Sequence, residues 1–111
     1  QIQGGALQGI GYALMEEYIL KEGRILNDSL STYIIPTSMD VPEIVPVIVE
    51  HNYSWGPYGA KGFGETPLVP AAPAIINAIA NATGLRLKHL PATPERVWAA
   101  WQQEHSQDSG V

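Results

Sequence analysis

The segment from Leu68 to Ala82 constrains the fold of this chain more than any other. Its sequence is LVPAAPAIINAIANA, which is apolar, rich in alanine and free of Asp, Glu, Lys and Arg. Alanine is the best helix former, and a helix that lacks a charged face is buried nearly all round. A chain of 111 residues and 12.0 kDa has little interior in which to bury such a helix. We therefore expect this segment to leave an apolar surface that the remainder of a larger protein covers.

The boundaries of this helix follow from three residue types. Thr66 is a good N-cap and Pro67 suits the first helical position, because its missing N–H would be unbonded there in any case. Pro73 lies deeper and indicates either a kink or a later start. Gly84 is expected to end the helix.

The first part of the chain predicts a helix, a hairpin and an irregular segment. Apolar residues at helical spacing favour a helix from about Gly5 to Glu17, whose glycines suit close packing or a backbone approach to a partner. Glu22-Gly23 is a plausible turn between two short pieces, Tyr18–Leu20 and Arg24–Leu26. Turn-forming residues and two prolines predict a mostly irregular segment from residue 27 to residue 42.

A strand and a final helix complete the expected fold. The run Glu43–His51 is rich in β-branched residues, and Pro46 within it is typical of an edge strand or a bulge. After a short extended piece, Thr93-Pro94-Glu95 predicts a helix to about Glu104, with Trp98 and Trp101 on its apolar stripe. We expect an α+β fold with about three helices packed on a small mixed or antiparallel sheet, and a polar tail over residues 105–111 that frays.

Composition excludes several classes of function. The formal charge is -5 and the six Lys and Arg are scattered, so a nucleic-acid footprint is absent. The chain has no cysteine, which excludes disulfides and iron–sulfur ligation by this chain, and its three histidines lack metal-ligand spacing. No run of about eighteen apolar residues predicts a membrane span. The chain opens on Gln1 without a targeting segment, and we expect it to be a piece of a longer protein of the cytoplasm.

The sequence GPYGAKGFGE, from Gly56 to Glu65, is the most informative ten-residue stretch for function. It contains four glycines and Lys61, and it ends in one carboxylate. Glycines let the backbone come close to a ligand, so Glu65 is a candidate base presented to that ligand. The alternative is an acid that merely favours the dipole of the following helix. A phosphate-binding P-loop is excluded, because Lys61 follows an alanine and precedes Gly62 rather than Ser or Thr.

Four segments in this order resemble the molybdopterin-binding subunit of the xanthine dehydrogenase and aldehyde oxidase family, the molybdenum hydroxylases. GAKGFGETP resembles the active-site loop of that family, and the opening QIQGGALQGIGYALMEE resembles its glycine-rich helix start. STYIIPTSMDVPEI and LPATPERVWAA resemble two further segments of the C-terminal part of that subunit. The resemblance covers residues 1–100 or so, which makes the chain a candidate fragment of a larger molybdopterin-binding domain.

The resemblance implies roles for residues at matching positions. Glu65 would be the general base for hydroxylation of an aldehyde or a xanthine-like N-heterocycle by an oxygen derived from water. The cofactor would be a molybdenum–pterin group shared with the remainder of the subunit, and iron–sulfur clusters and FAD would lie in partner domains or subunits. The residues implied to face the cofactor are Gln1, Gln8, Lys61, Gly62, Phe63 and Gly64. Phe63 departs from the small aliphatic residue expected before Gly-Glu, which leaves substrate size open.

Two classes of function therefore stay open. One is a catalytic piece of a molybdenum hydroxylase that is inactive by itself and depends on the rest of its subunit. The other is a non-catalytic structural or interaction module that retains the scaffold of the molybdopterin-binding domain. A ring-reducing relative of the hydroxylases would look the same over this segment.

Overall fold

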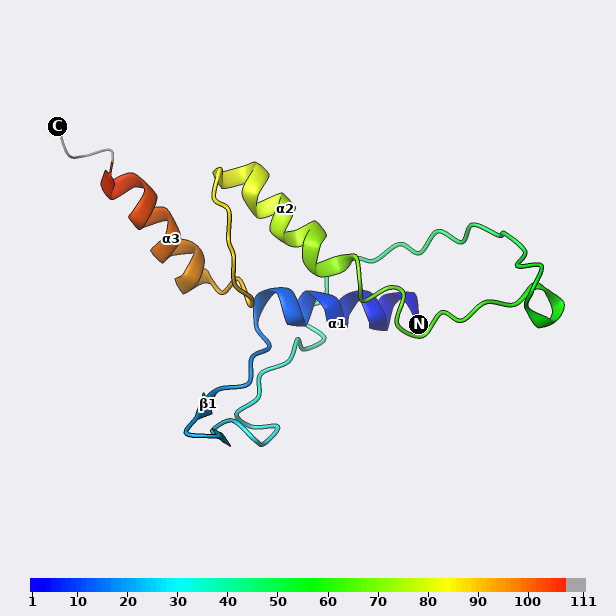
Figure 1. Ribbon diagram of the computed structural model, residues 1–111, viewed down its shortest axis with the longest axis horizontal. Coiled ribbons are helices and arrows are strands. Elements are labelled where there is room, and N and C mark those ends of the chain that lie inside the picture. Colours follow the sequence, from blue (N-terminus) through cyan, green and yellow to red (C-terminus); the bar gives the residue numbers. More distant parts are fainter. Residues whose placement is uncertain (108–111) are drawn as a thin grey trace.

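The computed structural model describes residues 1–107 and contains three α-helices and one two-stranded antiparallel sheet (Figure 1). The expected α+β class is confirmed. No helix among residues 1–107 is long and apolar enough to cross a membrane. In chain order the elements are helix α1 (Ile2–Leu14), strands β1 (Leu20–Lys21) and β2 (Arg24–Ile25), the short 3-10 helix η1 (Pro57–Gly59), helix α2 (Ala71–Thr83) and helix α3 (Pro94–Gln107).

Helices α1 and α2 form the one pair of helices that pack against each other in the described part of the chain. Glycines on α1 make this contact close. A Cβ atom added to Gly9 would lie 2.5 Å from the Cβ of Ala71 and 2.7 Å from the carbonyl oxygen of Leu68. A Cβ added to Gly5 would lie 2.9 Å from the Cβ of Pro67. The expectation that these glycines serve close packing is therefore confirmed at both positions.

Helix α2 begins later than Thr66-Pro67 predicts, at Ala71 with Pro70 as its N-cap residue. The prediction that Thr66 caps this helix is wrong. The segment before Ala71 is instead held against α1, where Pro67 is buried beside Gly5. The later start places Pro73 in the first turn, where a missing N–H costs nothing. Gly84 ends the helix in the left-handed conformation, with φ of 79°, as predicted.

The predicted hairpin is confirmed, and it is the only sheet within residues 1–107. Glu22 and Gly23 both have positive φ, at 49° and 76°, which is the backbone of a two-residue turn that follows strand twist. Buried Asn27 closes the base of the hairpin. Its Oδ1 accepts a hydrogen bond from the Ile19 N–H at 2.8 Å, and its Nδ2 donates to the Glu17 carbonyl oxygen at 2.7 Å.

The segment Glu43–His51 is extended but is not a strand of any sheet in the described chain, so the expected sheet differs in make-up from the observed one. A strand is defined by a hydrogen-bonded neighbour, and no backbone group within residues 1–107 is hydrogen-bonded to the backbone of this segment. The hairpin also stands apart from the helices, which pack on each other instead (Figure 1).

The last third of the chain is attached at the C-terminal end of α1. The Ala92 N–H donates to the Ala13 carbonyl oxygen at 2.6 Å, and Arg96 on α3 pairs with Glu17 at 2.7 Å and donates to the Pro91 carbonyl oxygen at 3.0 Å. Ala13, Leu85 and Ala92 are the buried hydrophobic residues of this small core. Helix α3 continues through residues 105–107, and the rest of the tail expected to fray lies outside the described residues.

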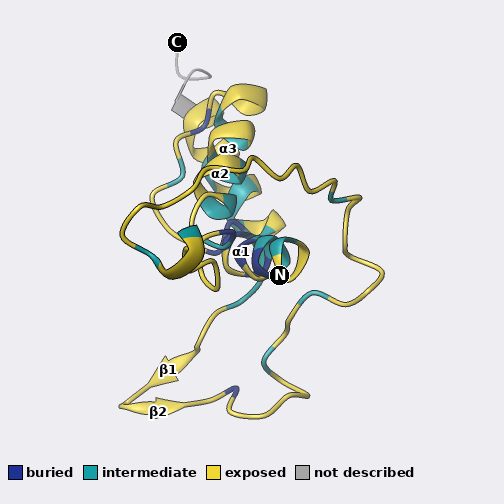
Figure 2. Ribbon diagram, turned by 90° about the vertical axis from the view of Figure 1, so that its right-hand side faces the viewer, coloured by how far each residue is buried: buried dark blue, intermediate teal, exposed yellow. Residues whose placement is uncertain are grey.

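The shape of the chain is far from that of a compact domain. Its radius of gyration is 18.4 Å, whereas a compact domain of this length has about 13 Å. It exposes 9071 Å², compared with about 6,000 Å² for a folded monomer of this mass. Exposed residues dominate the ribbon, and most of the buried ones lie on α1 or next to it (Figure 2). The expectation that the chain leaves extensive apolar surface uncovered is confirmed.

The glycine contact predicts opposite effects for two alanine substitutions on α1. Gly9→Ala should lower the midpoint of thermal unfolding of the intact protein that contains this chain, because overpacking costs about 1–3 kcal/mol. Gly4→Ala is the matched control, since a Cβ there meets nothing within 4 Å and alanine favours a helix by about 1 kcal/mol over glycine. Equal midpoints for the two variants would contradict the packing role of Gly9.

The pair formed by Tyr33 and Glu16 predicts a loss of stability at alkaline pH. The Tyr33 hydroxyl donates to Glu16 Oε2 at 2.9 Å. Burial, and then the hydrogen bond and the charge of Glu16, raise the pKa of Tyr33 from 10.0 to about 12. The unfolded chain therefore loses the tyrosine proton first, and this stabilisation should be complete below pH 10.0 and disappear as the pH rises to about 12.

Denaturant unfolding of the intact protein across this pH range measures the loss. Tyr33→Phe should unfold more easily than the parent protein below the window, and the difference should shrink within it. A difference that does not change with pH would show that Tyr33 does not titrate as the structure predicts.

Candidate functional site

A single hydrogen bond joins the two segments whose residues are candidates for function. The Gln1 side-chain Nε2 donates to the carbonyl oxygen of Gly64 at 2.8 Å, across 63 positions of sequence. Gln1 is the N-cap residue of α1, and its own carbonyl oxygen accepts from the Gly5 N–H at 2.9 Å. The start of the glycine-rich helix and the end of the GAKGFGE loop thus lie side by side.

The chain then runs along α1 from its first residue toward its middle. Gly64 is bonded to Gln1, Pro67 packs on Gly5, and the Leu68 carbonyl oxygen lies against Gly9. Glu65 lies within this run, next to the residue that Gln1 holds. Its position beside the first turns of α1 follows from contacts on both sides of it.

The Glu65 side chain is exposed and has no hydrogen bond or ion pair with any residue in the range 1–107. The one ion pair in that range joins Arg96 and Glu17, at the opposite end of α1. Glu65 also precedes α2 by several residues, so it does not sit at the N-terminus of that helix. The alternative interpretation, an acid placed for the helix dipole, therefore does not apply to α2.

Unused hydrogen-bond donors lie in the two segments that the bond between Gln1 and Gly64 joins. The backbone N–H groups from Lys61 to Thr66 donate to no group of the described chain. Gln8 is exposed with an unbonded side-chain amide, and it lies two helical turns from Gln1, on the same face of α1. Gly4, Gly62 and Gly64 each have open space where a Cβ would stand. Together these groups present amide donors and open backbone to a ligand that approaches the start of α1.

Phe63 contributes to an apolar groove at the same end of α1. Phe63 is half-exposed, and the groove has a volume of about 370 Å³. Its lining residues are Gln1, Ile2, Gln3, Pro46, Ile48 and Phe63. Glu65 is not among them, so this groove lies beside the candidate base and does not enclose it.

Sequence reasoning missed two features that position these residues. Gln3 Nε2 donates to the Ile44 carbonyl oxygen at 3.3 Å, which ties the extended segment to α1. The spacing of Gly5 and Gly9, one turn apart, marked the face of α1 that receives Pro67 and Leu68. The second missed feature is the segment that packs on this face, because it lies about sixty residues away in sequence and leaves no local signal.

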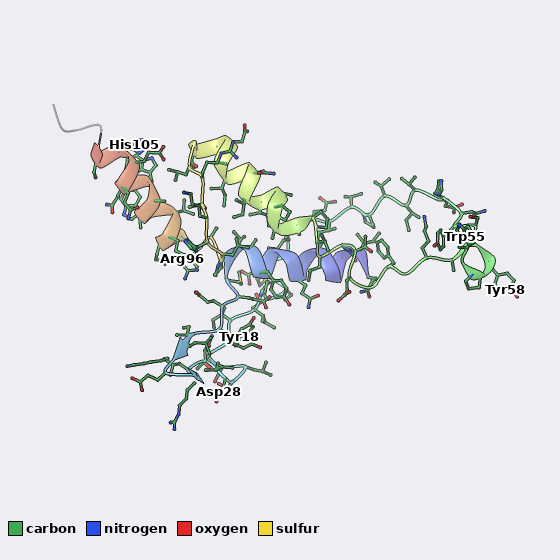
Figure 3. The ribbon with its side chains drawn as sticks, in the orientation of Figure 1. Tyr18, Asp28, Trp55, Tyr58, Arg96 and His105 are labelled. Atoms are coloured by element: carbon green, nitrogen blue, oxygen red, sulfur yellow. The ribbon has the colours of Figure 1, made fainter. Side chains whose placement is uncertain are left out.

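The far end of the loop carries no candidate residue but has a defined shape. The Tyr53 N–H donates to the Gly59 carbonyl oxygen at 3.2 Å and closes a turn around η1. Trp55 and Tyr58 lie at this tip, away from all three helices (Figure 3). Tyr58 adopts a left-handed conformation, with φ of 55°.

Direct metal ligation by this chain finds no support within residues 1–107. No group of three or more His, Cys, Asp or Glu side chains is placed to hold an ion there. The free hydrogen-bond donors of the site are amide N–H groups, which bind acceptor atoms of a ligand and do not ligate a metal ion.

The comparisons of this chain with known proteins agree on one protein family. Residues 1–42 match the family model described as the molybdopterin cofactor-binding domain. The chain is 43% identical over 100 residues to the putative xanthine dehydrogenase molybdenum-binding subunit XdhA of Escherichia coli K12, with 88% of this chain and 13% of that protein covered. It is 45% identical over 103 residues to the aldehyde oxidoreductase of Megalodesulfovibrio gigas, with 90% of this chain and 11% of that protein covered.

A solved structure has the same fold over almost the whole chain. The crystal structure of the Cu,Mo-CO dehydrogenase in its carbon monoxide reduced state superimposes with a TM-score of 0.80 at 28% identity. The match covers 92% of this chain and 13% of that one. The chain therefore spans about an eighth of the length of the relatives that it matches. On this agreement of sequence and fold, the chain belongs to the molybdopterin-binding subunits of the xanthine dehydrogenase and aldehyde oxidase family.

Proposed function

We propose that this chain supplies one side of the active site of a molybdenum hydroxylase that oxidises an aldehyde or a xanthine-like N-heterocycle. Glu65 is its general base. The observation that carries the proposal is the hydrogen bond from Gln1 to Gly64, because it joins the helix start to the loop that bears Glu65. The named relatives above are molybdenum-binding or aldehyde-oxidising proteins, which supports the class of chemistry.

The residues at this site fit a molybdenum–pterin cofactor held by hydrogen bonds. Gln8 and the N–H groups of Lys61 to Gly64 are free donors, and Gly62 and Gly64 leave room for a large group to approach the backbone. A pterin cofactor offers oxygen and nitrogen acceptors that such donors recognise. When bound, the cofactor supplies the metal that accepts the electrons released by substrate oxidation.

Within this proposal Gln1 has a positioning role and Gln8 a binding role. The Gln1 side-chain amide already donates a hydrogen bond to Gly64. Gln1 therefore fixes the loop, and that N–H is not available to bind the cofactor. Gln8 keeps its amide free and can donate to the cofactor. The backbone of Lys61 to Gly64 binds alongside, and the Phe63 side chain lines the neighbouring groove.

Glu65 then acts on a proton. The carboxylate takes a proton from the water-derived oxygen that attacks the substrate carbon, which makes that oxygen a stronger nucleophile. Because Glu65 has no partner in the described chain, no ion pair must break before it accepts the proton. The electrons would pass to iron–sulfur clusters and FAD in partner domains or subunits. This chain has no cysteine that could ligate an iron–sulfur cluster.

Substitution of Glu65 tests the catalytic role. Glu65→Gln in the intact, cofactor-loaded enzyme should lower kcat by about 10²–10⁴, the usual contribution of a general base. Glu50→Gln is the matched control, because it removes an exposed carboxylate from the same loop region. Molybdenum and pterin content should be unchanged in both variants.

Near-normal turnover by the Glu65→Gln enzyme would contradict the proposal. It would favour the alternative, a non-catalytic module that retains the scaffold. A parallel loss in both variants would indicate a general effect of charge on this region and would equally remove Glu65 as the base.

The isolated chain should neither retain the cofactor nor turn over substrate. Its donors line one side of an open surface, and the structure exposes 9071 Å² in all. We expect residues 1–111, expressed alone, to contain no stoichiometric molybdenum by elemental analysis and no pterin by fluorescence after oxidation. Stoichiometric cofactor in the purified chain would show that it holds a complete binding site.

A further inference from the structure

The extended segment Glu43–His51 carries backbone groups that have no partner. It runs outward from the helices to the tip at η1 (Figure 1). Its only backbone bond within residues 1–107 is the one that the Ile44 carbonyl oxygen accepts from Gln3, at 3.3 Å. From Val45 to Glu50, no N–H or C=O group is bonded. Backbone groups buried in a folded protein are almost always paired.

The two edges of this segment are unequal. In an extended chain, alternate residues direct their N–H and C=O groups to opposite edges. One edge has Ile44, whose oxygen is already bonded to Gln3, and Pro46, which has no N–H. The other edge has Val45, Val47 and Val49, which offer three free N–H groups and three free carbonyl oxygens. A neighbouring strand can therefore form a full ladder on one edge only.

The side chains alternate between two faces of the segment. Pro46 and Ile48 line the groove with Gln1, Ile2, Gln3 and Phe63, and Ile48 is still 76% exposed there. The three valines line no part of that groove, and their exposed fractions are 71% for Val45, 79% for Val47 and 84% for Val49. Three β-branched residues in a row of alternate positions are typical of a strand that is covered on that face.

The length and area of the chain indicate where the neighbour comes from. No charged residue lies from Ile44 to Val49, so the surface suits a permanent apolar contact and not a transient polar one. The chain exposes 9071 Å², which is about 3,000 Å² more than a compact monomer of this mass would expose. An excess of this size is in the range of obligate interfaces. It also spans only 13% of the XdhA subunit that it resembles.

We propose that Glu43–His51 is a β-strand of the intact subunit, paired along its Val45, Val47 and Val49 edge with a strand of the same polypeptide that lies outside residues 1–111. The partner has apolar side chains at alternate positions to cover the three valines. This segment leads through the tip at η1 to the loop of Lys61 to Glu65, so the added strand also fixes the outgoing limb of that excursion (Figure 1). The proposal stands whether or not Glu65 is the base.

Amide hydrogen exchange of the intact wild-type protein, resolved to single residues, tests the proposal. The N–H groups of Val45, Val47 and Val49 should exchange at least about 100-fold more slowly than those of Ile48 and Glu50, because only the first three are in the ladder. The protection should not depend on protein concentration and should be present without any partner subunit.

Four other outcomes of the exchange experiment would each overturn the proposal. Rapid exchange of all three valines would show that no strand is added. Equal protection of valines and of Ile48 and Glu50 would contradict the edge assignment. Protection that rises with protein concentration would identify a second copy as the neighbour, and protection that appears only in a complex would identify another subunit.

Two variants add an independent measurement. Val47→Pro removes an N–H from the pairing edge and should reduce the protection of Val45 and Val49 by at least about 10-fold. Pro46→Ala is the matched control, since it adds an N–H to the other edge and should leave that protection unchanged. If Val47→Pro fails to fold, the exchange of the wild-type protein still decides the question; unchanged protection in a folded Val47→Pro protein would overturn the proposal.

Discussion

The contact between two glycines of α1 and the segment that precedes α2 determines most of this structure. Gly5 and Gly9 allow Pro67, Leu68 and Ala71 to lie against the helix backbone at distances that no side chain would permit. This contact sets where α2 begins, because the residues before Ala71 are used in packing and not in the helix. It also brings the middle of the chain to the start of α1, and the candidate site forms at that junction.

The candidate site is built on rigid supports but is open. Gln1 caps α1 and holds Gly64, so the loop bearing Glu65 is anchored at one end by the helix and at the other by Pro67. The open side presents free amide donors and glycines without a neighbour. An arrangement of this kind suits the role proposed for this chain, as one of several sides that hold a large cofactor.

Two surfaces that no described residue covers differ in their chemistry. The segment Glu43–His51 exposes valines and unpaired backbone, which suits a strand. The groove between the end of α1 and α3 is almost entirely apolar, has a volume of about 710 Å³ and is bordered by the stacked rings of Trp98 and Trp101. The apolar stripe that the sequence predicts for the last helix thus lies along this groove. Both surfaces lie in a chain that spans only about an eighth of the length of the relatives it matches.

The sequence by itself determined the elements whose causes are local. The hairpin follows from Glu22-Gly23, the end of α2 follows from Gly84, and the apolar composition of Leu68–Ala82 already predicted a helix that this chain does not bury by itself. The family could be recognised from four short motifs, and Glu65 was singled out by its glycine-rich frame. Only the tertiary structure decided where α2 starts, which donors stay free and that Gln1 meets Gly64, because each depends on contacts between residues about sixty positions apart. It also decided that Glu43–His51 is extended without being a strand, since a strand needs a hydrogen-bonded neighbour that local sequence does not specify.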